Sequence, residues 1–496
     1  MTLTSMFAAS LEGRAARHAL DYERMDGTLA SLTFGEVDAR ASHMAAALSS
    51  RGLRTGDRCV VHLANRVEFI DLFLACLRLG VVFVPVNVLY RGRELSHIVS
   101  DSEPTLIVTS EEHSALFGGD SRVFSIERFN VIPKAAHETP MAPGDACDAG
   151  DAAPAVIIYT SGTTGKAKGA VLTRGNLAAN AAHVVDAWRI TADDRYLAVL
   201  PLFHVHGLGN GICSWLASGC AMRLVERFEI ARAAAWFDEF KPTLFFGVPT
   251  VYVRLLELTP AMQKQMGEPM RLFVSGSAPL PAQVMEDFHV RFGHRILERY
   301  GMSETLMNIG NPYDGERRPG CIGFPFANVE ARIVDESAAP VADNTVGQLE
   351  VRGPNVFAEY WRNAEATAKA FRDGWFRTGD MAERSHDGYY TLRGRASDLI
   401  ISGGFNIYPR EIEELLLDQP GVHEVAVVGA DDARRGEVVI AYIVADGDVS
   451  DDALRTACAS SLASFKTPRA FIRVDSLPRT ALGKIQRHLL PPWVRT

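Results

Sequence analysis

The sequence of 496 residues has few cysteines, no long uninterrupted apolar run and no excess of positive charge. Its seven cysteines are scattered and form no C-x-x-C pair, which argues against a disulfide scaffold or a zinc ribbon and favours a reducing compartment. The longest apolar stretch, residues 69–86, contains Asp71 and Arg78 and changes from helical spacing to a strand pattern at Gly80, so it predicts a buried helix and strand rather than a membrane span. The first residues lack the apolar core of a secretory signal, and we therefore expect a cytoplasmic protein.

The balance of charge limits the class of partner. Lys plus Arg number 51 against 60 Asp plus Glu, which gives a formal net charge of −9. A surface of this sign disfavours nucleic acid as a partner and repels anionic substrates on average, so an anionic substrate needs a local cluster of cations at its site. The hydrophobic fraction of 47% and the charged fraction of 22% are ordinary for a folded globular protein.

The spacing of apolar residues predicts an α/β fold. Between residues 32 and 110, helix-spaced apolar runs alternate with short β-branched runs, which indicates a parallel sheet with helices on its faces. Residues 137–154 are rich in Ala, Asp, Gly and Pro without periodicity and predict an exposed connection, after which a second αβ unit begins. From about residue 320 to residue 394, short strands and turns predict a small antiparallel, barrel-like layer.

After Arg395, strand and helix patterns return over about 100 residues, which is enough for a separate small α+β domain. We therefore expect a large N-terminal domain at residues 1–396 and a mobile C-terminal domain at residues 397–496. The cleft between two such domains is the expected place for a site.

A loop rich in Gly, Ser and Thr, YTSGTTGKAKG at residues 159–169, directly follows the apolar run 155–158. Backbone N–H groups and hydroxyls in such a loop point at an anion and its lysines neutralise charge, so the loop is suited to a polyphosphate. The Walker A spacing is absent, which disfavours a P-loop kinase. Taken alone, a loop of this composition is as often a flexible surface turn, so its meaning depends on the motifs that follow.

Four further motifs follow in the chain: RYGMSET at residues 299–305, GWFRTGDMA at 374–382, GRASDLIISGGFNIYPREIE at 394–413 and LPRTALGKIQR at 477–487. With the first loop, they resemble the signature motifs of the adenylate-forming superfamily, which contains acyl-CoA synthetases, adenylation domains of peptide synthetases and luciferases. The motifs occur in the family's order over most of the chain. The resemblance implies an enzyme that activates an acid with ATP.

The resemblance also implies nucleotide contacts from all of these motifs. Tyr300 would stack on the purine, Asp380 would accept from both ribose hydroxyls, Arg395 would reinforce the ribose or phosphate end, and Glu304 would bind Mg²⁺. Seen singly, each has a plainer explanation: a core tyrosine, a turn aspartate, an exposed arginine and a helix-capping glutamate. The expected nucleotide-binding residues are Thr160, Ser161, Gly162, Thr163, Thr164, Gly165, Lys166, Ser277, Ala278, Pro279, Glu298, Tyr300, Gly301, Met302, Ser303, Thr305, Asp380 and Arg395.

Lys484, in the last motif, is the residue expected to catalyse the first chemical step. Attack of a carboxylate on the α-phosphorus of ATP builds negative charge, which a lysine ammonium bridging the substrate and phosphate oxygens would stabilise. An isolated Gly-Lys near a C-terminus is most often a solvated surface lysine, and only the match to the family's motif favours catalysis. We expect Lys484, His204 and Glu304 to be the catalytic residues, with ATP, Mg²⁺ and coenzyme A as cofactor and co-substrates.

His204 lies in the segment PLFHVHG, which resembles the family's acid-binding and gating motif. A neutral imidazole there would donate to the substrate carboxylate and swing aside for the thiol to enter. For His206, a structural role in the core is the expectation. Ser275 and Gly276 belong to the segment SGSAP at residues 275–279, which resembles the loop that lines the adenine and acyl pocket.

The expected thiol acceptor is free CoA, because no carrier domain or phosphopantetheine-bearing serine motif follows Lys484. In the family the C-terminal domain rotates about a hinge after adenylation, which withdraws the lysine and guides pantetheine, here past Ser402, Gly403 and Gly404. The hinge position is Ser397, where the family usually has Asp or Lys, so the ease of rotation stays open.

Residues 246–254 and 298–315 resemble the corresponding segments of malonyl-CoA synthetases, in which two arginines clamp the far carboxylate of malonate. The matching residues are Arg254 and Arg299. Paired guanidinium groups supply the bidentate, charge-assisted bonds that a second carboxylate needs and a fatty acid does not use. We therefore expect malonate, methylmalonate or another short diacid as the substrate, bound by Arg254, Arg299, His204, Ser275, Gly276 and Met302.

Two other functions stay open. The first is a CoA ligase for a monocarboxylic acid, either fatty or aromatic, in which Arg254 is solvated on a helix. The second is a non-catalytic sensor whose cleft binds ATP or an adenylate. The joint presence of Lys484, Glu304 and Asp380 argues against the sensor, since binding alone does not require the lysine.

Overall fold

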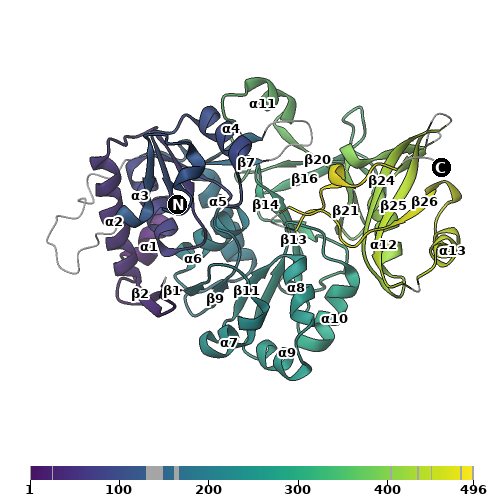
Figure 1. Ribbon diagram of the computed structural model, residues 1–496, viewed down its shortest axis with the longest axis horizontal. Coiled ribbons are helices and arrows are strands. Elements are labelled where there is room, and N and C mark those ends of the chain that lie inside the picture. The colour runs from purple at the N-terminus through teal and green to yellow at the C-terminus, as the bar shows by residue number, and fades with distance from the viewer. Residues whose placement is uncertain are drawn as a thin grey trace.

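The computed structural model describes residues 2–24, 26–129, 149–160, 167–402, 405–432, 435–447, 449–480 and 483–493. Its framework is four β-sheets, of which the last lies in the C-terminal part of the chain (Figure 1). Some predicted positions fall outside the described residues: residues 137–148 of the expected connection, and the site residues Ser161, Gly162, Thr163, Thr164, Gly165, Lys166, Gly403 and Gly404.

The largest sheet has nine strands in the order β15-β14-β13-β12-β11-β9-β10-β1-β2. The six strands from β13 to β1 are parallel, and β2, β14 and β15 pair antiparallel to their neighbours. The bounds are β1 (His18–Glu23), β2 (Leu29–Thr33), β9 (Arg195–Ala198), β10 (Ala221–Leu224), β11 (Leu244–Gly247), β12 (Leu272–Ser275), β13 (Leu297–Met302), β14 (Leu306–Gly310) and β15 (Phe324–Pro325).

The second sheet has seven strands in the order β18-β8-β7-β4-β3-β5-β6, and its strands from β7 to β6 are parallel. The bounds are β3 (Arg58–His62), β4 (Val82–Pro85), β5 (Leu106–Thr109), β6 (Val123–Ser125), β7 (Pro154–Thr160), β8 (Lys168–Thr173) and β18 (Glu359–Tyr360). The apolar stretch of residues 69–86 forms most of the buried helix α3 (Val67–Leu79) and then β4, as predicted. Gly80 ends α3 with φ 67°, a left-handed conformation that glycine adopts without strain.

Helices cover the faces of both sheets (Figure 1). Besides α3 they are α1 (Leu3–Leu11), α2 (Phe34–Ser50), α4 (Gly92–Ser102), α5 (Arg174–Ala187), α6 (Cys213–Ser218), α7 (Ile230–Phe240), α8 (Pro249–Leu256), α9 (Pro260–Gly267), α10 (Ala282–Phe292) and α11 (Ala364–Ala370). None of the helices in the described part of the chain is long and apolar enough to cross a membrane.

The predicted antiparallel layer is a five-stranded sheet in which β20 pairs with β17, β19 and β21. Its strands are β16 (Glu330–Val334), β17 (Gly347–Arg352), β19 (Phe371–Arg372), β20 (Trp375–Arg384) and β21 (Tyr390–Arg395). One large hydrophobic core runs from α1 to β21 and joins this layer to the two larger sheets. The α/β fold class predicted from the sequence is confirmed.

The C-terminal part has its own core. Its sheet contains β22 (Ile400–Ser402), β23 (Phe405–Ile407), β24 (Val422–Asp432), β25 (Gly436–Ala445) and β26 (Ala470–Arg473), with α12 (Pro409–Leu417) and α13 (Asp451–Ser461). The two hydrophobic clusters of this part contain only residues from Ile400 onward. In Figure 1 it forms the yellow-green end of the molecule, beside β20 and β21.

Candidate active site

The predicted site residues gather at the carboxyl ends of β12 and β13, which are parallel neighbours. Ser275 ends β12, and Arg299 and Tyr300 lie on β13. In α/β sheets the carboxyl ends of parallel strands form the edge at which ligands bind. The antiparallel pair β20 and β21 adds Asp380 and Arg395, which lie opposite each other in register.

Asp380 is the centre of a buried hydrogen-bonded group. The Tyr300 hydroxyl donates to its Oδ2 at 2.5 Å, and Arg395 Nε lies 2.9 Å from its Oδ1. Burial raises the pKa of Asp380, and the charge of Arg395 opposes that rise. Arg395 Nη1 also donates to the carbonyl of Thr378 at 2.9 Å, which fixes the guanidinium. The structure thus brings together three residues that the motifs predict to bind the nucleotide, although Tyr300 engages Asp380 through its hydroxyl as well as presenting a ring.

Glu304 lies in the turn between β13 and β14, not at the start of a helix, so a capping role for it is wrong. Thr160 Oγ1 donates to its Oε1 at 3.3 Å and the Tyr360 hydroxyl donates to the same oxygen at 3.0 Å. Within the described ranges no hydrogen bond falls on Oε2, so this hard oxygen fits Mg²⁺ beside the end of β7, where the phosphate loop starts. Tyr360 was not predicted, because the short strand β18 carries no motif.

Lys484 belongs to the C-terminal part and yet lies among the groups of the large body. Loss of hydration among the surrounding groups and the charge of Arg395 lower the pKa of its ammonium more than Asp380 and Glu304 raise it, so the net shift is downward. The side chain nevertheless remains exposed to solvent, and none of the described residues forms an ion pair with it. A lysine that is surrounded but unpaired is free to bind an anion.

A tight turn presents this lysine. Thr480 N donates to the Lys484 carbonyl at 2.8 Å, and Lys484 N donates to Thr480 Oγ1 at 3.1 Å. The Cα of Gly483 faces the side chain of Thr250 on α8, so the turn rests on the large body. No sequence motif predicted the part played by Thr250, because the contact joins segments more than 200 residues apart in the chain.

His204 precedes a π-helical turn at His206–Ile212. Its Nδ1 accepts from the backbone N–H of His206 at 3.2 Å. Burial, followed by the charges of Lys484 and Arg299, lowers the pKa of His204 to about 3. The imidazole is therefore neutral at pH 7, which is the form that can donate to a carboxylate without adding a charge.

Arg299 is a buried cation that forms no ion pair with any residue the structure describes. Its side chain is 5% exposed, and its Nε and Nη2 have no hydrogen-bond partner among the described residues. Burial lowers its pKa to about 9, while Tyr252 raises it. A buried guanidinium without a partner is costly, and native structures keep such groups where a ligand supplies the missing acceptor.

The other predicted clamp residue, Arg254, differs from Arg299 in its exposure. Arg254 stands on the last turn of α8, where it is exposed, and its guanidinium lies 5.6 Å from the ring centroid of Phe228. The exposed arginine therefore offers a cation at the surface, whereas Arg299 offers one in the interior.

Several predicted residues lie around the same strand ends with other contacts. The Thr305 hydroxyl accepts from Asn308 at 2.6 Å, and Glu298 Oε1 accepts from the backbone N–H of Leu280 at 3.0 Å, in the loop that contains Ala278 and Pro279. Gly301, Met302 and Ser303 form the end of β13 and the turn after it.

Ser402 and Ser397, the predicted CoA and hinge residues that the structure describes, are not joined to this group. Ser402 is buried on β22 of the C-terminal sheet, and Ser397 lies exposed in a short 3₁₀ turn, with its hydroxyl 3.1 Å from Asp398 Oδ1. No described contact links either serine to Lys484 or His204.

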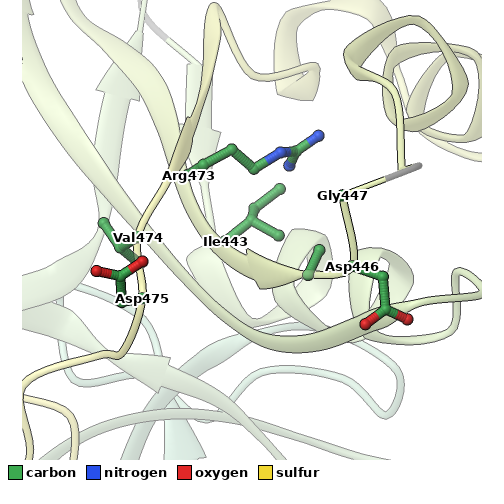
Figure 2. Close-up of a pocket in the computed structure, with 7 residues that line it drawn as sticks. Ile443, Asp446, Gly447, Arg473, Val474 and Asp475 are labelled. Atoms are coloured by element: carbon green, nitrogen blue, oxygen red, sulfur yellow. The ribbon is translucent and has the colours of Figure 1, made fainter.

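A separate hollow of about 250 Å³ lies in the C-terminal part, between the end of β25 and the chain after β26 (Figure 2). It contains Ile443, Asp446 and Arg473, and Arg473 is paired with Asp451 at 2.9 Å. None of the predicted site residues lines this hollow, so it is distinct from the group around Asp380.

Comparison with known proteins identifies two family regions. Residues 7–361 match the AMP-binding enzyme family, and residues 411–484 match the AMP-binding enzyme C-terminal domain. A malonate–CoA ligase of Arabidopsis thaliana is 35% identical over 88% of this chain and 78% of its own length. An indoleacetate–CoA ligase of Aromatoleum aromaticum is 34% identical over 92% of both chains.

The fold agrees with these matches. The crystal structure of ATP-bound MatB from Rhodopseudomonas palustris superimposes with a TM-score of 0.90 and 36% identity, and covers 99% of this chain and 98% of that chain. The relatives share the ligation of an acid to CoA but differ in the acid. The chain therefore belongs to the AMP-binding enzyme family and is an adenylate-forming acyl-CoA ligase.

Proposed function

We propose that this ligase joins a short dicarboxylic acid, malonate or methylmalonate, to coenzyme A. In the first step a carboxylate oxygen of the acid forms a bond to the α-phosphorus of ATP while the bond to pyrophosphate breaks. In the second step the CoA sulfur, having lost its proton, forms a bond to the acyl carbon and AMP leaves. The products are the acyl-CoA, AMP and pyrophosphate.

The unpaired guanidinium of Arg299 is the observation that carries this proposal. Its two buried nitrogens require acceptors, and a diacid brings a second carboxylate that an ordinary fatty or aromatic acid lacks. A monoacid would leave the buried charge uncompensated, which removes part of the binding free energy. The similarity to a malonate–CoA ligase and to MatB supports the same substrate class.

The alternative within the family is a monocarboxylic acid as the substrate, and the similarity to an indoleacetate–CoA ligase supports this alternative. Arg254 distinguishes a diacid substrate from a monoacid substrate less well than Arg299 does, because the Arg254 guanidinium is exposed beside Phe228. If Arg254 is a second clamp, Arg254→Ala raises the KM for malonate; an unchanged KM assigns it to the surface and leaves Arg299 to bind the second carboxylate alone.

For the first step we propose roles that follow from the contacts described above. Glu304 would hold Mg²⁺ next to the phosphates, and this ion would neutralise charge on ATP. Neutral His204 would orient the reacting carboxylate, and Lys484 would stabilise the negative charge that builds as the oxygen attacks phosphorus. Asp380 and Arg395 would hold the ribose. Because Lys484 is needed for the chemistry rather than for binding, its position argues against a non-catalytic nucleotide sensor.

For the second step we propose that the C-terminal part, residues 397–496, rotates about Ser397 and withdraws Lys484. The rotation would bring Ser402 and the following residues toward the body to guide pantetheine. The separate hydrophobic clusters of this part support its movement as one body.

An acid panel tests the proposed function. The purified protein with ATP, Mg²⁺ and CoA is offered malonate, methylmalonate, succinate, propionate and indoleacetate, and acyl-CoA products are identified by mass spectrometry. We expect the highest kcat/KM for malonate or methylmalonate. A higher kcat/KM for propionate or indoleacetate would refute the diacid assignment while leaving the ligase family intact.

A further inference from the structure

His206, like Arg299 and Ser275, is a buried polar side chain of the predicted acyl-binding region with an atom that lacks a partner among the described residues. It is 2% exposed, and its Nε2 has no hydrogen-bond partner among the described residues. Its Nδ1 lies 3.1 Å from the Ser277 hydroxyl. The sequence suggested only a structural role. Other histidines, such as His62 and His183, also have an unpaired ring nitrogen, and His206 differs from them in that the charge of Arg299 acts on its ring.

The contact with Ser277 is compatible with either tautomer of His206, and our proposal takes the one in which Nδ1 accepts from the Ser277 hydroxyl. A serine hydroxyl can donate to an unprotonated ring nitrogen, and no other acceptor for the Ser277 hydroxyl occurs among the described residues. With Nδ1 as the acceptor, the neutral ring carries its proton on Nε2. Burial and the neighbouring charge of Arg299 keep the pKa of His206 well below its usual value, so the ring stays neutral. In this tautomer the orphaned Nε2 is a neutral donor.

His206 and Arg299 flank the same two residues. The Arg299 guanidinium lies against Gly276, so closely that a methyl group there would stand 2.4 Å from its Cζ. The next residue, Ser277, has φ 69° and holds His206. Arg299 and His206 therefore contact adjacent residues of one short loop, and the charge of Arg299 acts on the His206 ring.

We propose that His206 is a specificity-determining residue that donates from Nε2 to the second acidic group of the substrate, beside Arg299. This inference rests on the proposed function, because it assumes an acid with two acidic groups. One guanidinium and one neutral donor match a group with a single negative charge and at least two oxygens, which is a carboxylate or a sulfonate rather than a phosphate dianion. His206 thus narrows the substrate class to diacids whose second group is a monoanion.

A pair of amide variants separates donation from simple packing. The amide of Gln in His206→Gln reaches the place of Nε2 and retains a donor there, whereas the shorter amide of Asn in His206→Asn reaches the place of Nδ1 and retains only the contact with Ser277. For His206→Asn we expect the KM for malonate to rise about 10- to 100-fold, the range for a hydrogen bond to a charged group. For His206→Gln we expect a rise of less than about threefold.

The KM for ATP and the unfolding temperature of each variant serve as controls. Loss of a donor to the acid raises the KM for malonate and leaves both of these quantities unchanged. Equal malonate KM values for folded His206→Gln and His206→Asn would overturn the inference. If one variant does not fold, Ser277→Ala replaces it. This variant loses the hydroxyl that donates to Nδ1 and that favours the tautomer with the proton on Nε2. A raised KM for malonate in Ser277→Ala supports the inference, and an unchanged KM overturns it. The wild-type protein distinguishes the two failures, because absence of turnover with every diacid refutes the proposed function itself.

Discussion

The guanidinium of Arg299 lies against the backbone of Gly276, and a β-carbon at Gly276 would stand 2.4 to 2.6 Å from its Cζ, Nε and Nη1 atoms. Such distances are shorter than any real contact, so the buried arginine occupies its position only because residue 276 is a glycine. A glycine at position 276 of the SGSAP segment is therefore needed to place the guanidinium that, in our proposal, binds the second acidic group of the substrate.

Replacement of this glycine is therefore a test of the position of Arg299. In Gly276→Ala the methyl group displaces the guanidinium, and we expect kcat/KM for malonate to fall at least about 10-fold, a loss typical of a misplaced charged hydrogen bond. The matched control is Gly92→Ala, at the start of α4, where an added β-carbon meets nothing within 4 Å. Similar kinetics for both variants would show that the close approach has no part in substrate binding.

Lys484 is expected to act in one half-reaction only. Lys484→Ala should slow malonate-dependent pyrophosphate exchange by about 10² to 10³, the loss usual when a single group that stabilises transition-state charge is removed. The same variant should still convert synthetic malonyl-adenylate and CoA to product, because the lysine is withdrawn in the second step. Lys369→Ala, which removes a lysine paired with Glu365 on exposed α11, controls for loss of positive charge. An equal loss in both half-reactions would contradict the rotation.

Glu298 should make stability depend on pH. Burial raises the pKa of this carboxyl from 4.5 to about 7, against the opposing charge of Arg410. Between these two values the folded protein keeps a proton that the unfolded chain has released, so the free energy of unfolding falls as the pH rises through this window. In Glu298→Gln the amide still accepts from Leu280 and does not ionise.

We therefore expect Glu298→Gln to be more stable than the wild type at pH 8 by about 1 to 3 kcal/mol, and the difference to vanish toward pH 5. Urea unfolding at both pH values measures it. The exposed Glu257 provides a control substitution, Glu257→Gln. A pH-independent difference between Glu298→Gln and the wild type would show that the carboxyl is ionised throughout.

The sequence predicted the fold class and the family because those depend on local patterns. The switch from helix to strand at Gly80 is set by neighbouring residues, and the adenylate-forming motifs are each continuous in the chain. The pairing of Asp380 with Arg395 also follows from one hairpin-like pair of strands.

The missed features depend on residues distant in the chain. Tyr360 meets Glu304 across 56 positions, and Tyr300 meets Asp380 across 80, through sheets whose strand order is not that of the sequence. The lack of a partner for His206 Nε2 is a property of packing on all sides of the ring, which no spacing of residues expresses. For the same reason the sequence predicts the same clamp role for Arg254 and Arg299, whereas Arg254 is exposed and Arg299 is buried.

The most direct test of the account compares the acid preference of the wild type with that of Arg299→Met, which keeps much of the side-chain volume and removes the charge. The measured quantity is the ratio of kcat/KM for malonate to kcat/KM for propionate. We predict a ratio well above one for the wild type and a fall of at least about 100-fold in the variant, because the second carboxylate loses its charged partner. An unchanged ratio in a folded variant would contradict the claim that the buried arginine selects a diacid.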